Sequence, residues 1–275
     1  MPTTGQVALL MVAVALFAAG GVISLLRLRW DREKLRIAAK ACLWGGVTVG
    51  IAVLVWHYRT RKSWLPLEDN FDALIWLGLL LTLFVLYVQR ARPLGGLDWF
   101  VMPIVILLLG AAAVFGLERP HAYAIEGPWS WVHWVSAYGG AVAFAVAGAV
   151  GAMYLIVNRR LRRKTAAGPN FGSLERLEHL TRAAVTLGFA MLTIGMITGM
   201  AIILNHPRGG TTLGPAWWRS PKVILALCVW VVYALVLHAP INPSFRGRKT
   251  AVLSILGFVL MIGTLVAVQY MPAQR

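Results

Sequence analysis

Eight long apolar runs constrain this chain more than any other feature. Each has about 20 residues, the length that an α-helix needs to cross the roughly 30 Å hydrocarbon core of a bilayer. Inside lipid, backbone N–H and C=O groups must be paired within the chain, so such runs form helices. Only 13% of the 275 residues are charged and 59% are hydrophobic, which excludes a soluble domain of this size. The sequence therefore predicts an all-α, polytopic integral membrane helix bundle of about eight transmembrane helices, forming a single membrane domain over residues 1–275. The predicted helices are Val7–Leu26, Ile37–His57, Phe71–Gln89, Trp99–Leu117, Ser130–Val157, Ala183–Leu204, Lys222–His238 and Ala251–Tyr270.

The basic residues indicate how these helices are oriented. The chain has 26 Lys and Arg against 10 Asp and Glu, a formal net charge of +16. In a membrane protein this excess marks cytoplasmic loops and not a nucleic-acid site. Most of these residues follow the first, third, fifth and seventh runs, including NRRLRRK at 158–164. We expect a multi-pass protein of the cell inner (plasma) membrane, with both termini outside. The first run has no basic residue before it, so it is expected to be a retained helix and not a signal peptide.

Small residues recur at helical spacing in the fifth and sixth runs. Such spacing allows helix backbones to approach closely in lipid, where burial of apolar surface gives no drive to associate. We therefore expect these two helices to be central packing partners. The small residues are Gly139, Ala143, Ala147 and Gly151 in the fifth run, and Gly195 and Gly199 in the sixth. Downstream, Ser173–Glu178 begins like a helix with an N-cap and predicts an interfacial helix leading into the sixth run.

A tryptophan pair beside two cations is the strongest chemical signal. Trp217 and Trp218 precede the seventh run, next to Arg219 and Lys222, and that run closes on His238. A porphyrin has an apolar face for indole, propionates for cations and an iron for imidazole, so the pattern favours haem. The alternative is that the tryptophans anchor the helix at the membrane interface.

The histidines are the candidate iron ligands. His133 lies at the outer end of the fifth helix between two tryptophans, and the alternative is an interfacial anchor. His238 ends the seventh helix, and the alternative is an interaction with the helix dipole. His57 has a weaker case, whereas His121 and His206 are expected in solvated outer loops and His179 in a structural role.

Signatures of substrate chemistry are missing. The sequence has no phosphate-binding glycine loop, no HExxH and no nucleophile elbow. Glu68, Asp69 and Asp72 suit the N-terminus of the third helix and do not indicate a proton relay. Binding and handling of a cofactor is therefore favoured over an enzymatic reaction.

From about residue 64 to residue 270 the chain resembles a family of membrane haem-handling proteins. These are the cytochrome c assembly proteins of the CcsA/ResC type, with their HemX- and YpjD-like relatives. The similar segments are WLPLEDNFDALIWLG, WVHWVSAYGGAVAF, LERLEHLTRAAVTLGFAMLTIGMITG and the region from GPAWWRSPKV through Tyr-x4-His and Arg-Gly-Arg to the last helix. Eight helices with both termini outside also fit the family.

The tryptophan-rich motif of the family reads approximately WGxxWxWDPKE. Here it is LGPAWWRSPKV, in which Gly214, Trp217, Pro221 and Lys222 match. Leu213 and Arg219 replace tryptophans, and Ser220 and Val223 replace the two acids. The external histidine of the family maps to His133 and its intramembrane histidine to His238. The second external histidine has no counterpart in the closing residues VAVQYMPAQR.

The resemblance implies a protein of cytochrome c biogenesis that binds non-covalent haem b and transports or presents it to apocytochrome c. The implied mechanism is ligand exchange, in which haem reaches a site near His238 and then an outward site where His133 supplies an axial ligand. Trp217 and Trp218 would pack on the porphyrin, with Arg219 and Lys222 near the propionates. A ResB-like membrane protein is the expected partner. The role implied is that of a chaperone or transporter, or part of a cytochrome c haem lyase complex. The alternative is a non-catalytic, HemX-like membrane regulator or scaffold that has lost full haem delivery.

The charge distribution generates a topology prediction. Reporter fusions at Arg163 and Arg248 should report the cytoplasm, and a fusion after Arg275 should report the exterior, because basic loops are retained inside. Alkaline phosphatase and fluorescent-protein activities measure this directly. A cytoplasmic signal from the last fusion would contradict it.

Overall fold

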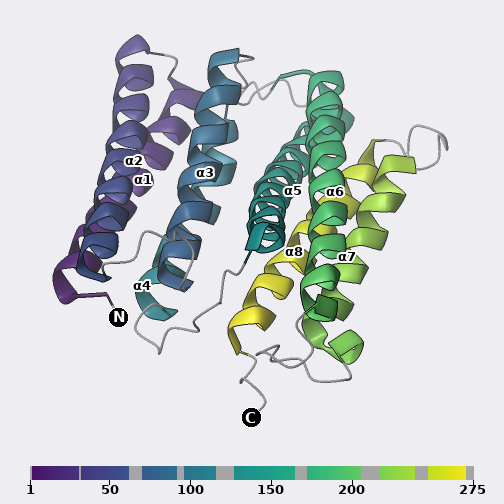
Figure 1. The fold of residues 1–275 in the computed structure, drawn as a ribbon. Coiled ribbons are helices and arrows are strands. Elements are labelled where there is room, and N and C mark those ends of the chain that lie inside the picture. Colours follow the sequence, from purple (N-terminus) through teal and green to yellow (C-terminus); the bar gives the residue numbers. More distant parts are fainter. Residues whose placement is uncertain are drawn as a thin grey trace. The chain divides into compact units, whose positions relative to one another are not determined.

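In a computed structural model, all the regular secondary structure of the described residues is helical (Figure 1). The structure describes residues 2–30, 32–61, 70–91, 96–115, 127–164, 172–205, 217–238 and 247–270. Its α-helices are α1 (Thr4–Arg29), α2 (Glu33–Arg61), α3 (Asn70–Ala91), α4 (Leu97–Phe115), α5 (Gly127–Arg162), α6 (Leu174–Asn205), α7 (Pro221–His238) and α8 (Arg248–Tyr270), with a short 3₁₀ helix, η1, at Trp217–Arg219. Every predicted helix is present, so the all-α prediction is confirmed.

Six of the described helices, α1 to α6, are long and apolar enough to cross a membrane. In α7 the apolar stretch is shorter, Val223–His238. These lengths and compositions confirm the polytopic membrane helix bundle.

Helix α6 begins earlier than its apolar run. The separate interfacial helix predicted from Ser173–Glu178 is continuous with α6, because no proline or glycine interrupts the intervening residues. The Ser173 hydroxyl caps this helix by accepting a hydrogen bond from the backbone N–H of Arg176 at 3.3 Å.

The helices divide into two compact units, and each is described by itself. Unit 1 comprises Met1–Ala124 with Leu161–Gly172, and unit 2 comprises Ile125–Arg160 with Ser173–Arg275. Each unit contains four of the α-helices over most of their length, α1–α4 in unit 1 and α5–α8 in unit 2. The single membrane domain expected over the whole chain stays a prediction.

In unit 1, α1 packs against α2 and α4, and α3 packs against α4 and α2. Two glycines of α2 contact large side chains, one from α1 and one from α3. A Cβ atom at Gly46 would lie 2.7 Å from Cε1 of Phe17, and one at Gly50 would lie 2.7 Å from Cδ2 of Leu79. Because real Cβ contacts are not this short, any larger residue at these positions would force Phe17 or Leu79 to shift.

In unit 2, two aromatic rings join the four helices. Phe144 of α5 stacks on Tyr233 of α7, with ring centroids 3.7 Å apart and an interplanar angle of 5°. The Tyr233 hydroxyl donates a hydrogen bond to the carbonyl oxygen of Ser254 on α8 at 3.2 Å. Gly188 of α6 lies against Phe144, and Gly257 of α8 lies against Tyr233. The stack therefore fixes the packing of α5 to α8.

The predicted small-residue stripe of α5 packs against two helices. Gly139 faces α6, where a Cβ atom would lie 3.5 Å from Sδ of Met191. The adjacent Gly140, which the prediction did not include, approaches the backbone of α6, where a Cβ atom would lie 3.5 Å from the carbonyl oxygen of Gly188. Gly151 approaches α8, where a Cβ atom would lie 2.9 Å from the carbonyl oxygen of Ala251. The predicted close packing of α5 with α6 is confirmed, and α8 is a further partner.

Gly188→Ala should destabilise unit 2. Its new methyl group would lie 2.5 Å from Cε1 of Phe144, whose ring is held by Tyr233, so we expect a loss of about 1–3 kcal/mol. Gly139→Ala is the matched control, because its Cβ atom would meet only the flexible Met191 side chain at 3.5 Å. Thermal unfolding in detergent measures both, and equal melting temperatures would contradict the packing.

Candidate functional site

His133 is held between α5 and α6. Its Nδ1 donates a hydrogen bond to the backbone carbonyl oxygen of Gly195 at 2.7 Å. A carbonyl can only accept, so Nδ1 carries the proton and the lone pair of the neutral ring lies on Nε2. Gly199, one turn further along α6, provides room for the ring, since a Cβ atom there would lie 3.0 Å from Cε1 of His133. Two glycines of α6 therefore set the orientation of this imidazole.

His238 is the last residue of α7 and is exposed. Its Nδ1 donates to the carbonyl oxygen of Ala234, one turn earlier, at 2.7 Å. The same reasoning places the lone pair of its neutral ring on Nε2. Both predicted iron ligands thus have the tautomer that can donate electrons from Nε2.

The two histidines lie near opposite ends of unit 2. The stacked pair Phe144 and Tyr233 places those residues of α5 and α7 at the same height. His133 precedes Phe144 by about three turns, and His238 follows Tyr233 by about one and a half turns. Since α6 runs antiparallel to both helices, α5 and α7 point the same way (Figure 1). The axial separation is therefore roughly 24 Å, and one iron atom cannot bind both rings.

The tryptophan pair lies in η1, immediately before α7, and therefore at the same end of unit 2 as His133. The Arg219 guanidinium carbon lies 4.5 Å above the ring centre of Trp218. Both side chains are exposed, and this cation–π contact keeps a positive charge beside an apolar ring face. The backbones of Trp217 and Lys222 lie in η1 and α7, but their side chains are outside the described part of the structure.

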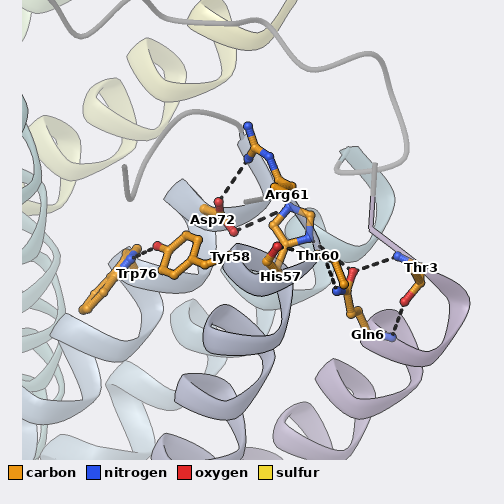
Figure 2. Close-up of polar contacts among 8 residues, drawn as sticks. All are labelled: Thr3, Gln6, His57, Tyr58, Thr60, Arg61, Asp72 and Trp76. Atoms are coloured by element: carbon orange, nitrogen blue, oxygen red, sulfur yellow. Dashed lines mark hydrogen bonds and ion pairs between the residues drawn. The ribbon is translucent and has the colours of Figure 1, made fainter. Parts of the chain in front are cut away.

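The remaining histidines differ in their surroundings. His179 is exposed on α6, and His121 and His206 lie outside the described residues. His57 lies in unit 1 and is fully buried. Figure 2 shows its polar contacts. Among the residues that the structure describes, no three His, Cys, Asp or Glu side chains lie close enough together to hold a metal ion.

Sequence reasoning missed a buried polar cluster around His57. Asp72 occupies the first turn of α3, as expected, but its carboxylate also contacts His57 and Arg61 of α2. The sequence did contain a sign of this cluster, because His57 and Arg61 end the second apolar run and Asp72 begins the third. Their pairing was hidden because it depends on how α2 packs against α3.

Comparison with known proteins gives consistent matches. The family model described as "Cytochrome C assembly protein" matches residues 64–272. The "Cytochrome c biogenesis protein CcsA" of Guillardia theta is 25% identical over 236 residues, covering 78% of this chain and 76% of that protein. The protein of the same name from Chlamydomonas reinhardtii is 27% identical over 229 residues, covering 78% of this chain and 62% of that protein.

One solved structure has a similar fold. It is titled "Cytochrome c Heme Lyase CcmF", with a TM-score of 0.66 at 17% sequence identity. The match covers 96% of this chain and 47% of that chain. At this identity the likeness concerns the fold alone.

Gly199→Ala should displace the His133 ring. The added methyl group would lie 3.0 Å from Cε1 and 3.1 Å from Nδ1, so the bond to Gly195 should break at a cost of about 1 kcal/mol. Gly195→Ala is the control, because its methyl group would meet nothing nearer than 3.6 Å. In ¹⁵N-histidine NMR spectra, the hydrogen-bonded Nδ1–H signal of His133 should survive in the control and vanish in Gly199→Ala. Its persistence in both variants would contradict this geometry.

Proposed function

Since the chain belongs to the cytochrome C assembly protein family, we propose that it is a membrane haem-handling protein of cytochrome c maturation. It binds haem b non-covalently and transports or presents it for attachment to apocytochrome c. The family match over residues 64–272 supports this role. The chain acts as a chaperone or transporter, and a ResB-like membrane partner assists covalent attachment.

The observation that carries the proposal is the way His133 is held. Histidines that ligate metals commonly donate their other ring N–H to a backbone carbonyl, which fixes the tautomer and orients the ring. The hydrogen bond from His133 to Gly195 supplies this arrangement across two helices. A purely interfacial anchor requires no such bond, because its ring only needs an amphipathic surrounding. The orientation of the His133 ring, with its lone pair on Nε2, therefore fits an axial ligand of haem iron.

The roughly 24 Å between the two histidines favours two ligand positions. At one end of unit 2, His133 supplies a ligand, and Trp217 and Trp218 pack on the porphyrin. Arg219 and Lys222 pair with the propionates there, and the contact of Arg219 with Trp218 keeps a cation beside the ring face. At the other end, His238 supplies a separate ligand. Its bond to Ala234 equally fits a helix-end role, so His238 needs its own test.

A second candidate function is that of a non-catalytic, HemX-like membrane regulator or scaffold. The specific observation in its favour is the altered tryptophan motif. Arg219 replaces a tryptophan, and Ser220 and Val223 replace the two acids. Less aromatic surface weakens a porphyrin site, whereas the altered motif leaves the helical fold intact.

His133→Ala should lower the haem content of the purified protein several-fold, because alanine has no lone pair for iron. Added imidazole should partly restore binding by occupying the vacated position. Haem per protein is measured by pyridine haemochrome absorbance, with His179→Ala on the exposed face of α6 as the control. An anchoring role predicts instead that His133→Trp retains full haem content, and that result would contradict ligation.

His238→Ala should also lower haem content, and His238→Lys should not restore it. A role at the helix C-terminus would be kept by lysine, whose charge suits the dipole. The same absorbance assay distinguishes the two roles. If His238→Lys kept the wild-type haem content, His238 would not be an iron ligand.

A further inference from the structure

The buried polar cluster of unit 1 joins the ends of three helices (Figure 2). Gln6 comes from α1, His57 and Arg61 from α2, and Asp72 from α3. Gln6, His57 and Asp72 are fully buried, whereas the side chain of Arg61 is 23% exposed. A buried ionisable pair in a membrane protein is costly, and such residues are commonly functional.

The orientation of the Gln6 amide is fixed by its neighbours. Its Oε1 accepts a hydrogen bond from the backbone N–H of Thr3 at 2.8 Å, in a capping box at the start of α1. A backbone N–H can only donate, so this side of the amide must be the oxygen. Its Nε2 correspondingly donates to the Thr60 hydroxyl at 3.2 Å, and that hydroxyl donates to the carbonyl oxygen of His57 at 2.8 Å. The amide therefore cannot be reversed.

This orientation determines the proton on His57. Its Nδ1 lies 3.2 Å from Oε1 of Gln6 and must donate to it. The opposite nitrogen, Nε2, faces Oδ1 of Asp72 at 3.9 Å. In a neutral ring with the proton on Nδ1, the Nε2 lone pair points toward a carboxylate, which is repulsive. A proton taken up between these two groups removes the repulsion.

Arg61 competes with that proton for the same carboxylate. Its Nη1 lies 3.3 Å from Oδ2 of Asp72. Two further neighbours of the ring are uncharged. They are Gln6 of α1 and Phe71 of α3, whose ring lies 5.1 Å from that of His57. Close by, the Tyr58 hydroxyl accepts a hydrogen bond from Trp76 at 2.7 Å. The Asp72 carboxylate therefore faces the ring, and the Arg61 guanidinium pairs with that carboxylate.

We propose that His57 and Asp72 form a proton-binding site in unit 1. The site takes up one proton from water onto Nε2 of His57, and the ring becomes an imidazolium paired with Asp72. The total charge of His57, Asp72 and Arg61 rises from zero to +1. Arg61 opposes uptake because it already neutralises the carboxylate. Proton binding therefore shifts Asp72 from Arg61 toward His57 and couples pH to the contact between α2 and α3. The site is distinct from the proposed haem ligands, which lie on α5 and α7.

The test uses the full-length protein in detergent micelles, labelled with ¹⁵N-histidine. Imidazole nitrogen shifts report both the tautomer and the protonation of each ring, and His57→Gln assigns the signal. At high pH the His57 ring should carry its proton on Nδ1, and on acidification it should gain one on Nε2. At a fixed pH within this transition, the ratio of imidazolium to neutral ring should rise about tenfold in Arg61→Gln and fall about tenfold in Asp72→Asn. Arg59→Gln, an exposed residue of α2, should leave the ratio unchanged.

Two results would overturn the proposal. A neutral ring with its proton on Nε2 in the wild-type protein would show that Gln6 does not set the tautomer. An unchanged ratio in Arg61→Gln would show that the guanidinium does not oppose protonation. Both measurements stand even if Asp72→Asn fails to fold, because neither requires that variant.

Discussion

The stack of Phe144 on Tyr233 is the interaction on which the arrangement of unit 2 depends. Lipid gives no hydrophobic drive for helix association, so close packing must supply it. Gly188 and Gly257 allow the two rings to fit between four helices, and the backbone carbonyl oxygen of Ser254 accepts a hydrogen bond from the Tyr233 hydroxyl. Tyr233 is also the tyrosine of the Tyr-x4-His motif. The stack therefore determines the position of α7 along the bundle, and with it the height of His238.

The same physical constraint appears wherever a histidine lies among the helices. A buried or half-buried imidazole needs a defined acceptor, because an unpaired polar group is costly away from water. Gly195 provides that acceptor for His133, and Gln6 provides it for His57. In both cases Nδ1 donates, so the lone pair of the neutral ring lies on Nε2. At His133 the proposed chemistry is iron ligation, whereas at His57 the facing carboxylate favours a proton.

The sequence alone could predict the helices and one packing surface. Long apolar runs determine where the chain crosses lipid, and the glycines of the fifth and sixth runs indicated the contact of α5 with α6. Hydropathy does not say which face of a membrane helix points inward, because lipid and protein interior are equally apolar. The contacts of His57 with Asp72 and of His133 with Gly195 depend on helix docking, so neither could be predicted. The resemblance already implied separate sites for His133 and His238, whereas their axial separation of roughly 24 Å required the helix packing.

The most direct test of the account is the absorption spectrum of the purified wild-type protein in detergent, recorded after haem is supplied and excess haem is removed. A haem-handling protein with imidazole ligands should show a Soret band and visible bands of nitrogen-ligated haem b, distinct from those of free haem in the same detergent. A spectrum without bound haem, from a protein that is folded and retains both histidines, would contradict the account. The regulator or scaffold function would then be the correct one.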